Sequence, residues 1–122
     1  MSIPAVRSAV LEAQLRQHLV DISRELVGLG LNRGTSGNAG VRLGEHFLVT
    51  PSGVPAADLR PQDMVLLDFS GVVLGPGRPS SEWRLHRDVL AARPEIQAVI
   101  HTHAPFATSL ACLGADLPPF HY

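Results

Sequence analysis

Two histidines one residue apart, His101 and His103, follow the apolar run 98–100. Successive side chains of a strand point to opposite faces, so these two imidazoles would share one face and lie close enough to bind one metal ion. On a helix the same reach would need a spacing of three or four residues. The structural alternative is that one or both are partly buried polar residues, hydrogen-bonded at a strand end. The pair alone does not separate a metal site from this role.

One acidic residue, Glu82, directly follows Ser80 and Ser81, where the sequence predicts the start of a helix. Acidic residues stabilise the first helical turn because the N-terminal end of the helix dipole is positive. A carboxylate beside a metal ion is also a common ligand or general base. Both interpretations stay open. His86, one helical turn later, is a possible pairing partner of Glu82.

Three short segments rich in glycine and hydroxyl side chains have the chemistry of an anion site. They are 35–38 (Thr-Ser-Gly-Asn), 50–53 (Thr-Pro-Ser-Gly) and 80–81 (Ser-Ser). Such segments offer backbone N–H groups and hydroxyls, and a helix that starts at 80–82 adds its positive end. Each segment alone also has a structural explanation in turn formation or helix capping. Together they predict one cradle for a phosphate group.

The chain contains no lysine. Schiff-base chemistry on carbonyl compounds, pyridoxal phosphate attachment and the lysine of a phosphate-binding P-loop are therefore excluded within these residues. Any carbanion chemistry carried out by these residues would need a metal ion.

The composition limits the class of protein further. The 122 residues are 45% apolar, which is enough to form the core of a single domain spanning 1–122. The formal charge is −1, and no basic block indicates nucleic acid or a membrane surface as a partner. No apolar run approaches the roughly 20 residues of a membrane span, and 1–4 lack the features of a secretory signal, so we expect a cytoplasmic protein. The single cysteine, Cys112, lies in an apolar run and is expected in the core.

The pattern of apolar residues predicts an α+β protein with an antiparallel sheet covered by helices. Apolar residues recur every three or four positions across 7–29, which is typical of an amphipathic helix that ends at Gly30. A second helix opens at 80–82 and ends before Arg93, and a third spans 105–113. Trp83 and Phe106 are expected in the core. The expected strands are 41–43, 47–50, 64–68, 72–74 and 96–102.

Five motifs stand in register along nearly the whole chain. They are 30–38 (GLNRGTSGN), 49–53 (VTPSG), 79–86 (PSSEWRLH), 101–103 (HTH) and 119–122 (PFHY). In this order and spacing they resemble the class II aldolase/adducin family, and closely follow its L-fuculose-1-phosphate aldolases. The resemblance implies a three-layer α/β/α domain with a central, mainly antiparallel sheet. It also implies one zinc ion per subunit and a homotetramer with active sites between subunits.

Carried over by position, the resemblance implies a role for each matching residue. His101 and His103 match zinc ligands, and Glu82 matches the carboxylate that holds zinc at rest and acts as acid/base. Tyr122 matches a tyrosine that reaches the neighbouring subunit's site as a proton donor. The positions that match the phosphate-binding residues are Gly37, Asn38, Ser52, Gly53, Ser80 and Ser81.

Two departures from the family pattern affect the site. Gly40 stands where members usually have serine, and we expect this to loosen the loop beside Asn38 and weaken its hydrogen bond. The family's third zinc-ligating histidine comes well after position 122, so we expect this chain to be the N-terminal portion of the domain. His121 is more simply a packing or hydrogen-bonding residue than a substitute ligand. The isolated 122 residues are then expected to bind zinc weakly, to self-associate and to lack activity.

The activity that the resemblance implies is zinc-dependent cleavage of a phosphorylated ketose, such as L-fuculose 1-phosphate, into dihydroxyacetone phosphate and an aldehyde. Zinc would polarise the carbonyl and its adjacent hydroxyl. Glu82 favours this over the family's pentulose-phosphate 4-epimerases, which tend to carry aspartate there. The alternatives are a decarboxylase, dehydratase or 4-epimerase of a related sugar acid or sugar phosphate, and a non-catalytic assembly module like the adducin heads. A scaffold would need none of Glu82, His101 and His103, so their presence disfavours the last alternative.

Overall fold

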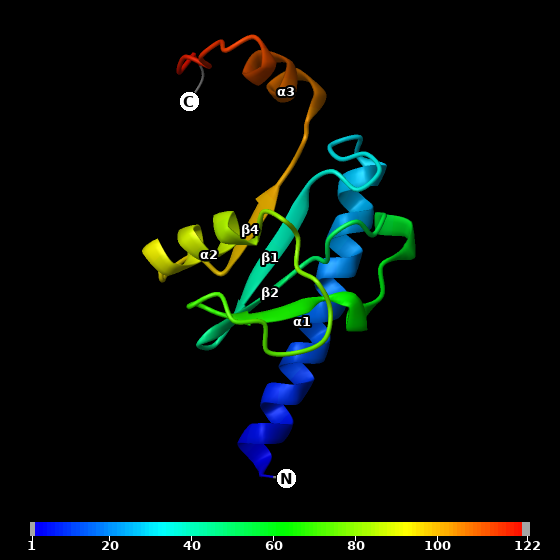
Figure 1. Ribbon diagram of the computed structural model, residues 1–122, viewed down its shortest axis with the longest axis vertical. Helices are drawn as coiled ribbons and strands as arrows, with labels where there is room; N and C mark the ends of the chain where they lie inside the picture. Colours follow the sequence, from blue (N-terminus) through cyan, green and yellow to red (C-terminus); the bar gives the residue numbers. More distant parts are fainter. Residues whose placement is uncertain (1, 121–122) are drawn as a thin grey trace.

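The computed structural model describes residues 2–120, and Figure 1 shows their arrangement. A long helix comes first, followed by a hairpin, a third strand, a second helix, a fourth strand and a short third helix. The helices are α1 (Ile3–Gly28), α2 (Trp83–Ala92) and α3 (Pro105–Cys112). The strands are β1 (Asn38–Leu43), β2 (His46–Val49), β3 (Val65–Asp68) and β4 (Ala98–His101), and two 3₁₀ turns lie at Ala56–Asp58 and Pro61–Asp63.

The four strands described here form one sheet in the order β3-β2-β1-β4, with every neighbouring pair antiparallel. β1 and β2 are joined by a tight turn in which Gly44 has a φ of 58°, a conformation that glycine adopts without a Cβ penalty. β1 is central: Gly40 lies opposite Val49 of β2 on one side and Val99 of β4 on the other. In the same register Asn38 lies opposite His101, which places two predicted site residues side by side.

Helices cover both faces of this sheet. Along β2, Leu48 packs with Leu19 and Val20 of α1, whereas Phe47 and Val49 pack on the opposite face in a cluster with Leu90 of α2. This alternation follows from the two-residue period of a strand, because both faces are buried and both sets of side chains are apolar. The three-layer α/β/α architecture expected from the sequence is confirmed.

Several boundaries differ from the sequence prediction for identifiable reasons. α1 begins at Ile3 rather than at 7, because the Ser2 hydroxyl caps the helix by accepting from the Ala5 N–H at 3.4 Å. Residues 72–74 form a single bridge, Leu67 to Val73, rather than a strand. The histidine strand ends at His101, so His103 lies beyond it.

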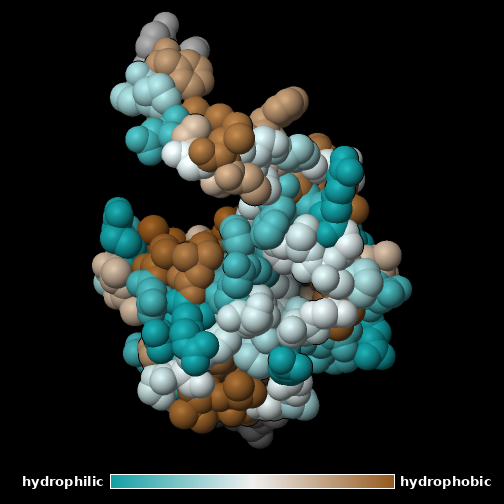
Figure 2. Space-filling view, turned by 45° about the horizontal axis from the view of Figure 1, so that its top comes forward, coloured by the Kyte–Doolittle hydropathy of each residue, from teal (hydrophilic) through white to brown (hydrophobic). Residues whose placement is uncertain are grey.

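The C-terminal segment extends away from the sheet, and Figure 1 shows α3 standing clear of the other layers. Phe106 is 89% exposed and Cys112 is exposed, so the expectation that both lie in the core is wrong. Apolarity alone predicted burial, but burial also needs a surface to pack against. Figure 2 shows the apolar side chains on this projecting segment. No helix within residues 2–120 has the length and apolarity to cross a bilayer.

Candidate metal and phosphate site

The two histidines are held by different parts of the fold. His101 is the last residue of β4, whereas His103 lies two residues past the strand end. The backbone N–H of His103 donates to the Leu31 carbonyl at 3.1 Å and to Asn32 Oδ1 at 2.9 Å. The imidazole centroids are 5.0 Å apart. The two imidazoles therefore lie close together, as strand alternation predicts. His103 lies beyond the end of β4, however, and its backbone is held by the segment that follows α1.

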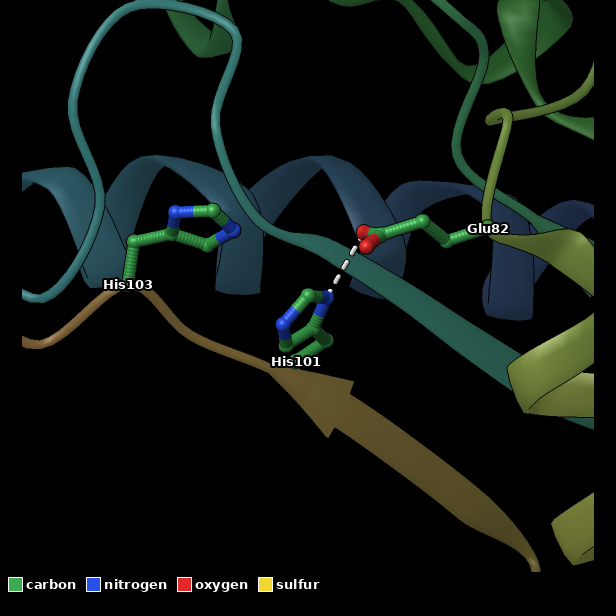
Figure 3. A group of neighbouring side chains, drawn as sticks. All are labelled: Glu82, His101 and His103. Atoms are coloured by element: carbon green, nitrogen blue, oxygen red, sulfur yellow. Dashed lines mark hydrogen bonds and ion pairs between the residues drawn. The ribbon is translucent and has the colours of Figure 1, made fainter. Parts of the chain in front are cut away.

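Glu82 completes the cluster from the N-terminal end of α2, where it occupies the N-cap position. Its Oε2 lies 2.8 Å from His101 Nδ1, and Figure 3 marks this contact with a dashed line. One ligand atom from each of Glu82, His101 and His103 lies within 4.8 Å of the others. Two imidazole nitrogens and a carboxylate oxygen are a donor set found at catalytic zinc centres, where a fourth position is left open. The residues present fit zinc in donor chemistry and in spacing.

The charge state of Glu82 suits a cation. Asn38 Nδ2 donates to Glu82 Oε2 at 2.6 Å, and this hydrogen bond is the main reason that the pKa of Glu82 lies below its ordinary value. His101 and His103 add smaller electrostatic contributions in the same direction. The carboxylate is therefore ionised at neutral pH and half exposed, with 44% of its side-chain surface open to solvent.

Asn38 also contacts His86, a residue whose place at the site the sequence did not reveal. Asn38 is buried, and its Oδ1 lies 2.5 Å from Nε2 of the fully buried His86. Burial lowers the pKa of His86 to about 4, so its imidazole is neutral. The possible pairing of His86 with Glu82 is not made: the ring packs against the sheet and bonds Asn38 instead. The positions 38 and 86 were each visible in the motifs, but only the packing of α2 on β1 brings them together.

The three predicted anion loops meet in one place. A single hollow is lined by residues of all three loops together with Glu82 and His103. The loop residues at its wall include Gly37, Asn38, Ser52, Gly53, Ser80 and Ser81. The convergence expected from the sequence is thus observed, while the binding of phosphate there stays a prediction.

Two details show how the loops are built. Gly37 has a φ of 74°, and a Cβ at this position would lie 2.2 Å from Nδ2 of the Asn32 side chain, so only glycine fits. Ser80 is buried, and its hydroxyl oxygen accepts from the Glu82 N–H at 3.2 Å. That hydroxyl still has its own proton to donate. Ser80 therefore has a structural role in holding Glu82 as well as a place at the hollow.

The departure at Gly40 has a different consequence from the one expected. Gly40 lies within β1, not in a loop, and the hydrogen bond of Asn38 is made. A Cβ on Gly40 would lie 2.8 Å from Nδ1 and 3.0 Å from Cγ of His86. The glycine therefore gives the buried imidazole its space. Tyr122 and His121 lie outside the described residues.

Comparison with known proteins gives a consistent result. A family model described as "Class II Aldolase and Adducin N-terminal domain" matches residues 17–122. Among curated relatives, a 5-methylthioribulose-1-phosphate/5-deoxyribulose-1-phosphate aldolase from Rhodospirillum rubrum is 58% identical over 108 residues, which is 88% of this chain and 49% of the relative. The L-fuculose phosphate aldolase of Escherichia coli K12 is 38% identical over 89% of this chain and 51% of its own length.

Solved structures agree with the sequence relatives. An L-fuculose 1-phosphate aldolase superposes with a TM-score of 0.83 at 38% identity, covering 89% of this chain and 53% of the other. The L-fuculose-1-phosphate aldolase of Thermus thermophilus gives a TM-score of 0.74 at 32% identity, over 90% of this chain and 56% of the other. The chain spans about half the length of the curated relatives it matches.

Proposed function

Because the chain belongs to the class II aldolase and adducin family, we propose that the protein is a zinc-dependent aldolase acting on a phosphorylated ketose. The observation that carries this proposal is one juxtaposition. A Glu82, His101 and His103 cluster with zinc-like spacing borders a hollow lined by three hydroxyl- and glycine-rich loops. A metal site beside an anion cradle suits a substrate that has both a carbonyl and a phosphate group.

The residues divide the chemistry between them. His101 and His103 would hold the metal, with Glu82 as the third ligand from this chain. Zinc bound there would polarise the ketose carbonyl and stabilise the negative charge that develops on its oxygen when the neighbouring C–C bond breaks. In this cleavage the hydroxyl on the departing carbon loses a proton, and the carbon left behind gains one.

Glu82 would exchange the second of these protons. Its carboxylate borders the hollow and is half exposed, so it can reach a substrate carbon as well as the metal. We assign the transfer of the hydroxyl proton to Tyr122 of a neighbouring subunit: as the proton donor that the family resemblance implies, it would supply this proton in the condensation direction, and its phenolate would take the proton up in cleavage. The loops at 37–38, 52–53 and 80–81 would bind the phosphate through N–H groups and hydroxyls, which fixes the carbonyl relative to the metal.

The identity of the relatives orders the candidate substrates. The match to the methylthioribulose-phosphate aldolase, at 58%, exceeds the match to the fuculose-phosphate aldolase, at 38%, over nearly the same span. We therefore propose 5-methylthioribulose 1-phosphate or 5-deoxyribulose 1-phosphate as the preferred substrate, with L-fuculose 1-phosphate as the second candidate. All three would yield dihydroxyacetone phosphate and an aldehyde.

We further propose a homotetramer with active sites between subunits. Large apolar side chains on the projecting C-terminal segment, such as Phe106 and Leu113, are 89% and 79% exposed. Surfaces of this kind are favoured at contacts between subunits. A subunit contact there would also bring the segment that leads to Tyr122 towards a neighbouring molecule.

The test is a substrate panel with the full-length protein. Each ketose 1-phosphate is incubated with zinc-loaded protein, and dihydroxyacetone phosphate is followed by a coupled reduction with NADH. Cleavage of at least one of the three sugars supports the proposal, and the preferred sugar ranks the candidates. Turnover of a sugar acid alone, or zinc binding without turnover of any sugar, would contradict the aldolase assignment. Absence of both zinc and turnover would favour an adducin-like assembly module.

A further inference from the structure

His86 is completely buried, and its ring has two nitrogens in unequal surroundings. Nε2 lies 2.5 Å from Asn38 Oδ1, whereas Nδ1 is buried with no hydrogen-bond partner among the described residues. His86 sits on the inner face of α2, one turn after Glu82, and Asn38 lies on the facing surface of β1.

The donors and acceptors in this chain of contacts have only one consistent arrangement. The Glu82 carboxylate accepts, so the amide nitrogen of Asn38 must face it, as the 2.6 Å contact requires. The amide oxygen then faces His86 and accepts as well. His86 must therefore donate through Nε2–H, which leaves the lone pair on Nδ1.

The surroundings of the imidazole favour this single form. Burial keeps His86 neutral, so the ring carries one N–H and not two. Gly40 lies beside the ring, and a Cβ there would be only 2.8 to 3.2 Å from Nδ1, Cγ and Cβ of His86, so a residue without a side chain is needed for the imidazole to occupy this place. Glu82 and His101 are the charged or titratable groups that act on His86, and neither is hydrogen-bonded to it.

We propose that His86 is a positioning residue: through Nε2–H it locks the Asn38 amide in the orientation that presents Nδ2 to Glu82 and so aims the Glu82 carboxylate at His101 and His103. This inference rests on the proposed metal-binding role of that cluster. Without the His86 donor, the Asn38 amide is free to turn over and present its oxygen to the carboxylate. Two acceptors would then face each other, and Glu82 would move from its place.

Two replacements of His86 separate the donor from the bulk of the side chain. His86→Leu fills similar volume without a donor, whereas His86→Gln keeps an amide N–H near the position of Nε2. Zinc dissociation constants are measured in the full-length protein by competition with a chromophoric chelator. Because outer-shell partners of metal ligands typically contribute about 10- to 100-fold to affinity, we expect about a 10-fold loss for His86→Leu and less than about 3-fold for His86→Gln.

A double-mutant cycle with Asn38→Ala tests the route of the effect. If His86 acts through Asn38, His86→Leu weakens zinc binding no further once Asn38 is alanine. Leu90→Ala, a buried change on the same helix, is the matched control: it should lower stability and leave the zinc affinity of the folded protein unchanged. Additive losses in the cycle, or wild-type affinity in folded His86→Leu, would overturn the proposal.

The tautomer gives a readout that needs neither metal nor activity. Long-range ¹H–¹⁵N spectra of the metal-free protein at pH 7 should show His86 protonated at Nε2, and a proton on Nδ1 would refute the inference even if His86→Leu fails to fold. If the protein binds no zinc, the proposed function is contradicted, while the tautomer still shows whether His86 donates to Asn38 through Nε2–H. Zinc binding without sugar cleavage would defeat the aldolase activity and leave the positioning role standing.

Discussion

Mild acidification should destabilise the metal-free protein through His86. The folded pKa of this histidine is about 4, against an ordinary value of 6.5, because burial disfavours the charged ring. Between these two values the unfolded chain binds a proton that the folded chain does not. Stability therefore rises with pH across this window: the contribution of His86 is fully present above pH 6.5 and is lost as the pH falls towards 4.

The structure sets the size of the effect. A tenfold change in proton affinity corresponds to about 1.4 kcal/mol, so the whole window represents about 3 kcal/mol of unfolding free energy, of which about 2 kcal/mol falls between pH 7 and 5. Glu82 does not contribute to the pH dependence of stability in this range, because its pKa lies below its ordinary value and its effect on stability is confined to lower pH. The change is large against the 5–15 kcal/mol typical of a domain.

Urea unfolding of the EDTA-treated protein, followed by the fluorescence of the single tryptophan, Trp83, measures this directly. The wild type should lose about 2 kcal/mol of unfolding free energy between pH 7 and 5. His86→Gln lacks the titrating imidazole, so its loss over this range should be smaller by about 2 kcal/mol. The control is His18→Gln, which removes an exposed histidine of α1 and should keep the wild-type slope. Equal pH slopes in wild type and His86→Gln would refute the claim that His86 is buried in the neutral form.

Two further substitutions test the scaffold and the phosphate cradle. The Arg42 guanidinium donates to the backbone carbonyls of Leu90, Ile96 and Arg93. Arg42→Met should therefore lower the free energy of unfolding in urea by about 2 kcal/mol. Arg84 is exposed, so Arg84→Met is the control, and an equal loss in that variant would contradict a stabilising role specific to Arg42. Ser81→Ala at the hollow should raise KM for a ketose 1-phosphate about 10-fold with a smaller change in kcat, because one hydroxyl contact to phosphate is lost. An unchanged KM would exclude Ser81 from the phosphate site.

The sequence was sufficient to predict the helices and the antiparallel sheet that they cover because those signals were local. The apolar period of α1, the hairpin glycine Gly44 and the proline that begins α3 each act within a few residues. The sequence could not place α3, since its apolar residues predict burial whether the covering surface belongs to the described residues or to something else. Residues 72–74 likewise carry a strand-like composition but make only one bridge to β3.

The site divides in the same way. Glu82, His101 and His103 were metal-ligand candidates from their types and spacing, and the family resemblance implied their role as zinc ligands. The groups that hold them were not: Asn32 fixes the backbone of His103 across 71 positions, and His86 meets Asn38 across 48. Such contacts depend on the register of β1 with β4 and on how α2 packs over the sheet, which no local pattern specifies. Supporting residues of a site are therefore harder to find than its ligands.

The most direct test of the central claim is metal removal and restoration in the full-length protein. Release of dihydroxyacetone phosphate from 5-methylthioribulose 1-phosphate is measured before EDTA treatment, after it, and after one equivalent of zinc per subunit is returned. We predict that cleavage is lost with the metal, returns with zinc in wild type, and does not return in His103→Ala. Cleavage that persists in the metal-free protein, or that zinc restores equally in His103→Ala, would contradict a catalytic zinc held by Glu82, His101 and His103.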